Sequence, residues 1–217
     1  MTTFLDRERL WDLAAAAPLI LWFGVGAAGC SFKIVDLLDT QSGAIAVLVQ
    51  IANLLFFLLA ITLLIIRRPA LRKSEGIAPR LAGVLGCVMP LTVLAPPRAE
   101  VSYATSVLLS ALGVVGIVGS IYTMLWLGRS FSVLPQARGL VTDGPYRVVR
   151  HPLYLAEFFV IFSRAFELAQ PWPFLVIVLA VGSQLARMYY EERILSEQFP
   201  AYREYVRHTA RLIPGVF

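Results

Sequence analysis

The chain has 217 residues, of which 58% are hydrophobic and only 15% charged, and its mean hydropathy is +0.73. A water-soluble domain needs more polar residues to cover its surface, so this composition indicates a membrane protein and excludes a large soluble domain. The formal net charge is +5. The basic residues lie in short loops beside apolar runs. We therefore expect them to set the orientation of the helices in the membrane and to contact lipids, and we expect no nucleic-acid partner.

Apolar segments follow one another along the chain, and each is a candidate membrane helix. They are residues 13–30, 43–66, 81–95, 101–127, 153–168 and 172–186. A crossing of the hydrocarbon core needs roughly 20 apolar residues, so the third and fifth segments are short and typical of tilted or re-entrant pieces. The pattern predicts an all-α fold, a polytopic membrane helical bundle of about six transmembrane helices.

The distribution of lysine and arginine predicts the orientation, because these residues are retained on the cytoplasmic side of a membrane. With both termini inside, the basic residues of 67–80, of 129–150 and of the C-terminal end fall in the cytoplasm, and only Lys33 and Arg98 lie outside. We therefore predict that both termini are cytoplasmic. From the small size of the chain we expect a bacterial inner membrane.

Residues 24–29 match the dinucleotide fingerprint GxGxxG. That fingerprint needs a preceding strand and a following amphipathic helix, whereas these residues lie in the middle of an apolar membrane segment, so we exclude a nucleotide site. Small residues at four-residue spacing, here Gly24 with Ala28, instead let two membrane helices approach closely. We expect the same role for Gly113, Gly116 and Gly119 of segment 101–127.

Cys30 and Cys87 are the only cysteines of the sequence, and both lie in apolar segments. Their positions have no ligand-like spacing and suggest no disulfide framework. We interpret both as packing residues and expect no metal site.

Charged residues inside the fifth segment break its apolar pattern. Lipid would penalise Glu157, Arg164 and Glu167 by a few kcal/mol each, so we expect all three to face protein or water. Arg164 and Glu167 are predicted near the outer interface, where long side chains reach water. Glu157 is predicted near the cytoplasmic end.

The loop between the fourth and fifth segments is the longest polar stretch of the chain. A sharp turn is predicted at Asp143, Gly144 and Pro145. Pro152 is suited to the first position of the fifth helix, because the N–H that proline lacks has no partner there in any case. The free N–H groups of that helix start, beside Arg150 and His151, form a candidate anion site for a carboxylate or phosphate.

A second polar cluster follows the sixth apolar segment, which we expect to continue as a helix out of the membrane. Arg187 and Glu191 are four residues apart and share one face of that helix. Two interpretations are open at this point. The residues form either an ion pair at a helix end or part of a functional site.

Four motifs follow one another near the C-terminal end of the chain. They are Gly-Pro-Tyr-Arg-x-x-Arg-His-Pro-x-Tyr-Leu at 144–155, Arg-x-x-x-Glu-Glu at 187–192, Phe-Pro-x-Tyr-x-x-Tyr at 199–205 and Arg-Leu-Ile-Pro-Gly at 211–215. In this order they resemble the isoprenylcysteine carboxyl methyltransferase and phospholipid methyltransferase superfamily. Each motif alone is weak, but the ordered set is fairly specific. The resemblance divides the chain into about four N-terminal transmembrane helices in 1–127 and a methyltransferase motif region in 128–217, with two further membrane helices and a cytoplasmic C-terminal tail.

The resemblance implies S-adenosylmethionine as the cofactor, bound without a Rossmann domain at the cytoplasmic face. The cofactor contacts it implies are Arg138, Gly139, Leu140, Val141, Tyr146, His151, Pro152, Leu153, Tyr154 and Glu191. Arg187 takes the position of the substrate-directed arginine, and with Glu191 it forms the implied catalytic pair. The helix start at Pro152 agrees with this assignment, because the cofactor carries a carboxylate.

The sequence also departs from the family pattern. Arg138 stands where the family commonly has histidine, and Ala156 stands where it often has glycine. The segment His208-Thr209-Ala210 replaces the usual Arg-Val-Pro. These departures put the contact at Arg138 and the identity of the substrate in doubt.

The leading functional hypothesis is methylation of a lipidic acceptor that enters from the bilayer, first of all carboxyl O-methylation of a prenylcysteine-type carboxylate held by Arg187. An amine acceptor, as in phospholipid N-methylation, would need a base such as Glu191, Glu192 or Glu157. A small hydrophobic thiol is a further possible acceptor. A hypothesis from another functional class is that the protein is a non-catalytic membrane protein, such as a transporter or an assembly factor. Membrane lipids and the acceptor are the expected partners, with no nucleic acid and no metal.

Overall fold

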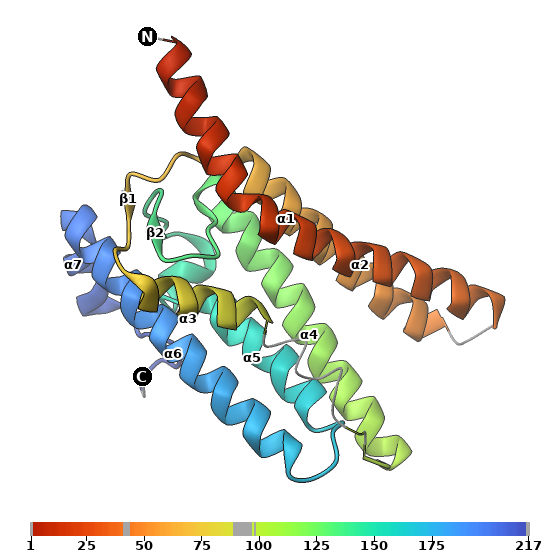
Figure 1. The fold of residues 1–217 in the computed structure, drawn as a ribbon. Coiled ribbons are helices and arrows are strands. Elements are labelled where there is room, and N and C mark those ends of the chain that lie inside the picture. The colour runs from red at the N-terminus through yellow and green to blue at the C-terminus, as the bar shows by residue number, and fades with distance from the viewer. Residues whose placement is uncertain (1, 41–43, 89–96, 98, 216–217) are drawn as a thin grey trace.

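The apolar runs of the sequence form helices that lie side by side as a bundle in the computed structural model, which describes residues 2–40, 44–88, 97 and 99–215 (Figure 1). The helices and strands, in chain order, are α1 (Thr2–Asp39), α2 (Ala44–Ile66), β1 (Arg72–Lys73), α3 (Ile77–Val88), α4 (Tyr103–Leu127), β2 (Gln136–Ala137), α5 (Pro152–Ala165), α6 (Trp172–Gln198) and α7 (Pro200–His208). Short 3₁₀ turns, η2 (Gly128–Ser130) and η3 (Gly144–Arg147), interrupt the loop between α4 and α5.

Four helices of the described chain are long and apolar enough to cross a membrane: α1, α2, α4 and α6. In contrast, α3 has 12 residues and α5 has 14. At about 1.5 Å of rise per residue, both are shorter than a hydrocarbon core of about 30 Å. The prediction of an all-α membrane protein is confirmed, but the predicted count of six crossings is not. Residues 89–95 of the third apolar segment lie outside the described residues.

The close helix approach predicted for the glycines of segment 101–127 is found, and the partner helix is α5. A Cβ on Gly116 would lie 2.7 Å from Val160 Cγ2 and 2.8 Å from the Ala156 carbonyl oxygen, and one on Gly113 would lie 2.9 Å from Ser163 Oγ. Only a residue without a side chain permits this approach. The start of α5, which carries the Arg-His-Pro motif, is therefore held against α4.

The packing of α1 on α2 corrects one prediction. Gly26 faces Phe57 of α2, and a Cβ there would lie 2.7 Å from the phenyl ring. Gly24, in contrast, has no atom within 4 Å of its ideal Cβ position, and Ala28 is exposed. The prediction that Gly24 and Ala28 let another helix approach closely is wrong, because the helix turns Gly26, not Gly24, toward its neighbour. The GxGxxG pattern lies within the continuous helix α1, so it does not form a nucleotide-binding turn.

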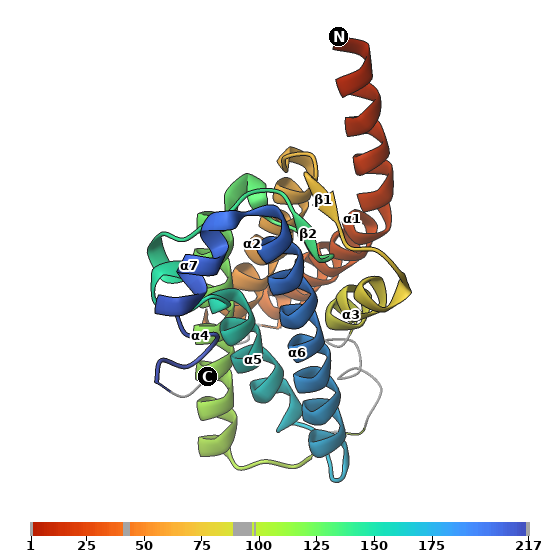
Figure 2. The ribbon, with the colours of Figure 1, turned by 90° about the vertical axis from the view of Figure 1, so that its left-hand side faces the viewer.

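One end of the bundle carries β1, β2, η3 and α7, and we call it the polar end (Figure 2). Here β1 pairs with β2 in antiparallel register, Arg72 opposite Ala137 and Lys73 opposite Gln136. This pairing holds the loop that precedes α5 against the segment that follows α2. Phe131 and Val133 of this loop, together with Leu153 of α5, belong to an apolar core with residues of α1, α2 and α4.

The C-terminal segment is tied to the start of α5. Val149 forms a parallel bridge with Ala210, the Arg150 N–H donates to the Ala210 carbonyl at 2.8 Å, and the His151 N–H donates to the Arg211 carbonyl at 3.1 Å. Motifs that are far apart in the sequence therefore meet at the polar end.

Candidate functional site

A pocket at the polar end brings most of the predicted site residues together. It is lined by residues from the loop before α5, the start of α5, the end of α6 and α7. The predicted residues that line it are Gly139, Leu140, Val141, Tyr146, His151, Leu153, Tyr154, Arg187 and Glu191. Pro152 is not among the lining residues and serves as the first residue of α5, as its sequence position predicted.

His151, Tyr154 and Arg187 form a packed column beside the pocket. The His151 and Tyr154 rings stack with their centroids 5.3 Å apart, and the Arg187 guanidinium carbon lies 4.6 Å from the centroid of the Tyr154 ring. All three side chains are buried. Pro152 starts α5 between His151 and Tyr154, so the local geometry of the helix start sets the spacing of the two rings.

Glu191 is the acidic residue of the pocket wall. Its Oε2 accepts a hydrogen bond from the Tyr154 hydroxyl at 2.7 Å. The carboxylate is half-buried and therefore remains within reach of a ligand. A carboxylate held in this way is suited to an ammonium, a sulfonium or a pair of hydroxyls.

Arg187 is buried in a polar environment of its own. It donates to Gln184 Oε1 at 3.0 Å and to the Val133 carbonyl at 3.4 Å, and its Nη1 lies 3.5 Å from Glu157 Oε2. Glu157, which the sequence placed within a membrane segment, thus faces protein as predicted. Gly86 of α3 leaves room for this arginine, because a Cβ there would lie 2.7 Å from Arg187 Cδ.

Glu192 has a different environment from Glu191, although the two are adjacent. Its carboxylate accepts hydrogen bonds from Arg211 Nη2 at 2.6 Å and from His151 Nε2 at 3.0 Å, and it lies 3.2 Å from Arg150 Nη1. Glu192 therefore holds the Arg-His-Pro motif and the C-terminal segment together. Sequence reasoning considered Glu192 only as a possible base, and the arginine of the motif at 211–215 was the available indication of this pairing.

Tyr146 and Tyr202 line the pocket with buried hydroxyl groups that have no hydrogen-bond partner within the described residues. Burial raises the pKa of both hydroxyls well above the ordinary value for tyrosine, and the nearby carboxylates raise it further. Both are neutral donors at physiological pH. Tyr205 of α7 donates its hydroxyl to the Tyr146 carbonyl, and burial raises the pKa of Tyr205 to about 12. Two residues that line the pocket therefore have a hydroxyl donor without a hydrogen-bond partner among the described residues.

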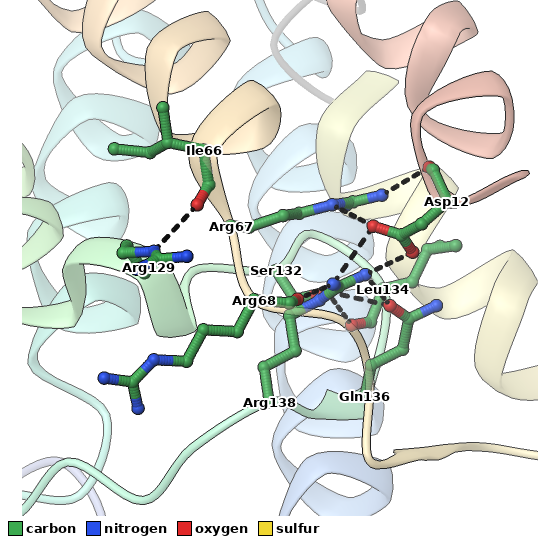
Figure 3. A network of polar contacts seen from close by, with 9 residues as sticks. All are labelled: Asp12, Ile66, Arg67, Arg68, Arg129, Ser132, Leu134, Gln136 and Arg138. Atoms are coloured by element: carbon green, nitrogen blue, oxygen red, sulfur yellow. Dashed lines mark hydrogen bonds and ion pairs between the residues drawn. The ribbon is translucent and has the colours of Figure 1, made fainter. Parts of the chain in front are cut away.

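The structure does not bring the Arg138 side chain to the pocket. Its guanidinium is buried beside Asp12 of α1, with Nη2 2.8 Å from Asp12 Oδ1, and it also donates to Gln136 Oε1 at 2.6 Å (Figure 3). Sequence reasoning missed Asp12 because its partner is far away along the chain. Gly139, the residue after Arg138, does line the pocket.

The comparison with protein families connects this pocket to a known group of proteins. Residues 101–202 match the model of the phospholipid methyltransferase family. The match covers α4, α5 and α6 and reaches the start of α7, which are the elements that build most of the pocket. It begins before residue 128, so the matched part includes α4 as well as the motif region.

Two curated proteins are also similar to the chain. The cobalt-zinc-cadmium resistance protein CzcN of Cupriavidus metallidurans is 32% identical over 119 residues, and the nickel-cobalt-cadmium resistance protein NccN of Alcaligenes xylosoxydans xylosoxydans is 32% identical over 114 residues. The alignments cover 50% and 48% of this chain, and the chain spans about half the length of each relative, 50% and 51%. The predicted resemblance is thus confirmed by the family match: residues 101–202 carry the pattern of the phospholipid methyltransferase family, part of the membrane methyltransferase superfamily that includes the isoprenylcysteine carboxyl methyltransferases.

Proposed function

We propose that the protein is an S-adenosylmethionine-dependent methyltransferase that modifies a lipidic acceptor entering the pocket from the bilayer. The observation that carries the proposal is the meeting of two motifs in one pocket, where Tyr154 of α5 donates its hydroxyl to Glu191 of α6. The match of residues 101–202 to a methyltransferase family supports it independently. The apolar helices support an integral membrane location.

The residues of the pocket fit the chemistry of the cofactor. S-adenosylmethionine carries a carboxylate, an ammonium group, a sulfonium and ribose hydroxyls. Glu191 would hold the ammonium or the ribose hydroxyls, and the neutral hydroxyls of Tyr146 and Tyr202 would donate to the carboxylate or to ring nitrogens. The stacked rings of His151 and Tyr154 supply an aromatic wall beside these groups.

When bound, the cofactor supplies a methyl group activated by its sulfonium. The protein's task is then to position an acceptor in line with that methyl group and to exclude water. The buried column of His151, Tyr154 and Arg187 gives the pocket a rigid wall. No residue of the chain needs to act as a covalent nucleophile.

We place a carboxylate acceptor of the prenylcysteine type first, because Arg187 lies in the pocket wall and a guanidinium binds a carboxylate well. A phospholipid amine is the second candidate, favoured by the family that residues 101–202 match. In that case Glu157 or Glu191 would take the proton of the amine. The two candidates differ in the charge that they present to Arg187, so variants of this residue distinguish them.

We infer that the pocket faces the cytoplasm of a bacterial cell. The segment 67–73, with its arginines and lysine, leads from α2 into the strand that pairs with β2, and it supports this orientation because basic loops are retained inside. Lys33 lies near the other end of α1, on the side expected outside.

The names of the two relatives refer to metal resistance. Within the described part of the chain, no group of three or more His, Cys, Asp or Glu side chains could hold a metal ion. The metal resistance in these names is said of the two relatives, and the proposed function does not draw on it.

The first experiment is calorimetric binding of S-adenosylhomocysteine to detergent-purified protein, with His151→Ala and Glu191→Ala beside the wild type. We expect saturable binding by the wild type and its loss in both variants. A folded wild-type protein that binds no S-adenosylhomocysteine would contradict the methyltransferase proposal and favour a non-catalytic membrane protein.

The acceptor is identified by transfer of labelled methyl from S-adenosylmethionine in lipid vesicles. One reaction contains a prenylated cysteine and the other contains phosphatidylethanolamine. We expect labelling of the prenylated cysteine by the wild type and about a hundredfold loss in Arg187→Met, because the carboxylate then loses its guanidinium partner. Labelling of phosphatidylethanolamine alone would overturn the choice of a carboxylate acceptor.

A further inference from the structure

A buried ion network joins the N-terminal helix to the loop that lines the pocket. Asp12 of α1 lies between two arginines, with its Oδ2 2.8 Å from Arg67 Nε and its Oδ1 2.8 Å from Arg138 Nη2 (Figure 3). The Arg138 side chain is fully buried, and those of Asp12 and Arg67 are 12% and 6% exposed. Such a network is buried too deeply to be a surface ion pair of negligible energy.

Arg138 connects this network to the pocket loop. Its Nη2 donates to Gln136 Oε1 at 2.6 Å, and its Nη1 donates to the Arg68 carbonyl, which fixes the loop against the end of α2. Ser132 Oγ donates in turn to the Leu134 carbonyl at 2.9 Å. Ser132, Leu134 and Gln136 all line the pocket.

The segment that follows Arg138 has little freedom to move without changing the pocket. Gly139 is packed so closely that an ideal Cβ would lie 2.6 Å from Ser130 Oγ, and Gly139, Leu140 and Val141 all line the pocket. A rearrangement of Arg138 therefore moves backbone that a cofactor would contact. The guanidinium itself remains outside the pocket.

Asp12 is the acidic partner of Arg138, whose guanidinium also donates to Gln136 and to the Arg68 carbonyl. One carboxylate lies between two guanidinium groups, so its removal leaves two buried cations close together without a counter-ion. Arg138 would then turn toward water or toward another acceptor. Arg67 has a different place in the network. Within the part of the chain that the structure describes, its Nε donates to Asp12 Oδ2 and its Nη2 to the Asp12 carbonyl, and it makes no hydrogen bond to the pocket loop.

We infer that Asp12 is a positioning residue of the methyltransferase site: through Arg138 it holds the segment 136–141 in the conformation that receives the cofactor. This inference rests on the proposed function. Helix α1 lies outside residues 101–202, so this contribution comes from a part of the chain that the family match does not cover.

The test compares Asp12→Asn with Arg67→Gln in detergent-purified protein. Asp12→Asn is expected to raise the dissociation constant of S-adenosylhomocysteine about tenfold. The ligand must then order the loop when it binds, which makes the net free energy of binding less favourable. In Arg67→Gln the Asp12–Arg138 pair remains, and the dissociation constant is expected to stay within about twofold of the wild-type value. Hydrogen exchange should become faster in residues 132–141 of Asp12→Asn and not in those of Arg67→Gln.

A double-mutant cycle then separates a positioning role from general stability. If Asp12 acts through Arg138, Asp12→Asn causes no further loss of affinity in an Arg138→Gln background. If Asp12→Asn does not yield folded protein, S-adenosylhomocysteine binding is measured with Arg138→Lys instead. Lysine keeps the positive charge but cannot contact Asp12, Gln136 and Arg68 at once, so we expect a severalfold weaker affinity.

The outcomes distinguish the two proposals. Wild-type protein that binds S-adenosylhomocysteine while Asp12→Asn binds it equally well would overturn the role of Asp12 and leave the proposed function standing. Equal losses in Asp12→Asn and Arg67→Gln would also overturn it. A wild-type protein without binding would remove the proposed function, and the inference with it.

Discussion

Glu191 and Glu192 show at the scale of single residues how adjacent positions of one helix serve different parts of the molecule. A helix turns by about 100° per residue, so the two carboxylates point in different directions. Glu191 lines the pocket beside Tyr154, whereas Glu192 binds Arg150, His151 and Arg211. The first is suited to ligand binding and the second to stability.

Replacement of these residues by glutamine should separate the two roles. Glu191→Gln keeps an acceptor for the Tyr154 hydroxyl but removes the charge, so we expect about tenfold weaker S-adenosylhomocysteine binding and a nearly unchanged melting temperature. Glu192→Gln leaves cationic partners without their carboxylate and should lower stability by about 3 kcal/mol. Calorimetry and thermal unfolding in detergent measure both effects. The same loss of melting temperature in both variants would contradict this division.

Local motifs made most of the pocket residues predictable from the sequence. His151, Tyr154 and Glu191 lie in short patterns with a recognisable order, and the structure brings them to one pocket. Asp12 was not predictable in this way. Its partner Arg138 is distant in sequence, and nothing in the local pattern around either residue specifies that the two will meet.

At the scale of helices, the contact of α4 with α5 is what positions the start of α5. The Arg-His-Pro motif lies at that start, so any separation of the two helices would displace pocket residues. The glycines that recur in segment 101–127 predicted a close helix approach, but they did not predict that α5 is the partner. For α1 the sequence pointed to Gly24 with Ala28, whereas Gly26 meets α2, since Gly24, Gly26 and Gly29 are all small and only the rotation of the helix distinguishes them.

Alanine substitutions test this difference between the glycines. Gly116→Ala places a Cβ 2.8 Å from the Ala156 carbonyl oxygen, so the helices must separate, and we expect a loss of about 1–3 kcal/mol together with weaker cofactor binding. Gly24→Ala is the matched control, because its Cβ would meet no atom within 4 Å. Helix propensity then makes Gly24→Ala neutral or slightly stabilising. A Gly116→Ala protein as stable as the control would contradict the close packing.

The lengths of the helices were harder to predict than their positions. Helix α1 extends from Thr2 to Asp39, well beyond the apolar residues 13–30, because hydrogen bonding along a helix continues where the membrane ends. Helix α6 continues beyond its apolar residues, as the sequence predicted, and it ends at Gln198. Apolar length indicates how much of a helix suits lipid, and it does not fix where the helix begins or ends.

For the molecule as a whole, the paired strands and α7 lie at one end of a membrane bundle (Figure 2). Residues of β2 and α7 line the pocket, so the pocket belongs to the same end. Exposed positions at opposite ends make the predicted orientation testable. Arg203 is exposed on α7, at the polar end, and Lys33 is exposed near the other end of α1.

Single cysteines at these positions, introduced after replacement of Cys30 and Cys87, should react differently with a membrane-impermeant thiol reagent. In right-side-out vesicles we expect labelling of Lys33→Cys and protection of Arg203→Cys, because basic loops are retained inside. Inverted vesicles should give the reverse pattern. Labelling of Arg203→Cys in right-side-out vesicles would contradict a cytoplasmic pocket.

The pair formed by Asp12 and Arg138 also affects how this protein can be recombined with its relatives. The family match covers residues 101–202, which suggests that this segment could be exchanged between relatives as one piece. Arg138 lies inside the segment, however, and its counter-ion Asp12 lies outside it, on α1. A chimera that receives another protein's 101–202 would place Asp12 opposite a residue that did not evolve with it. Position 12 and position 138 therefore have to be inherited together, and compensating changes at the two positions should appear wherever one of them varies.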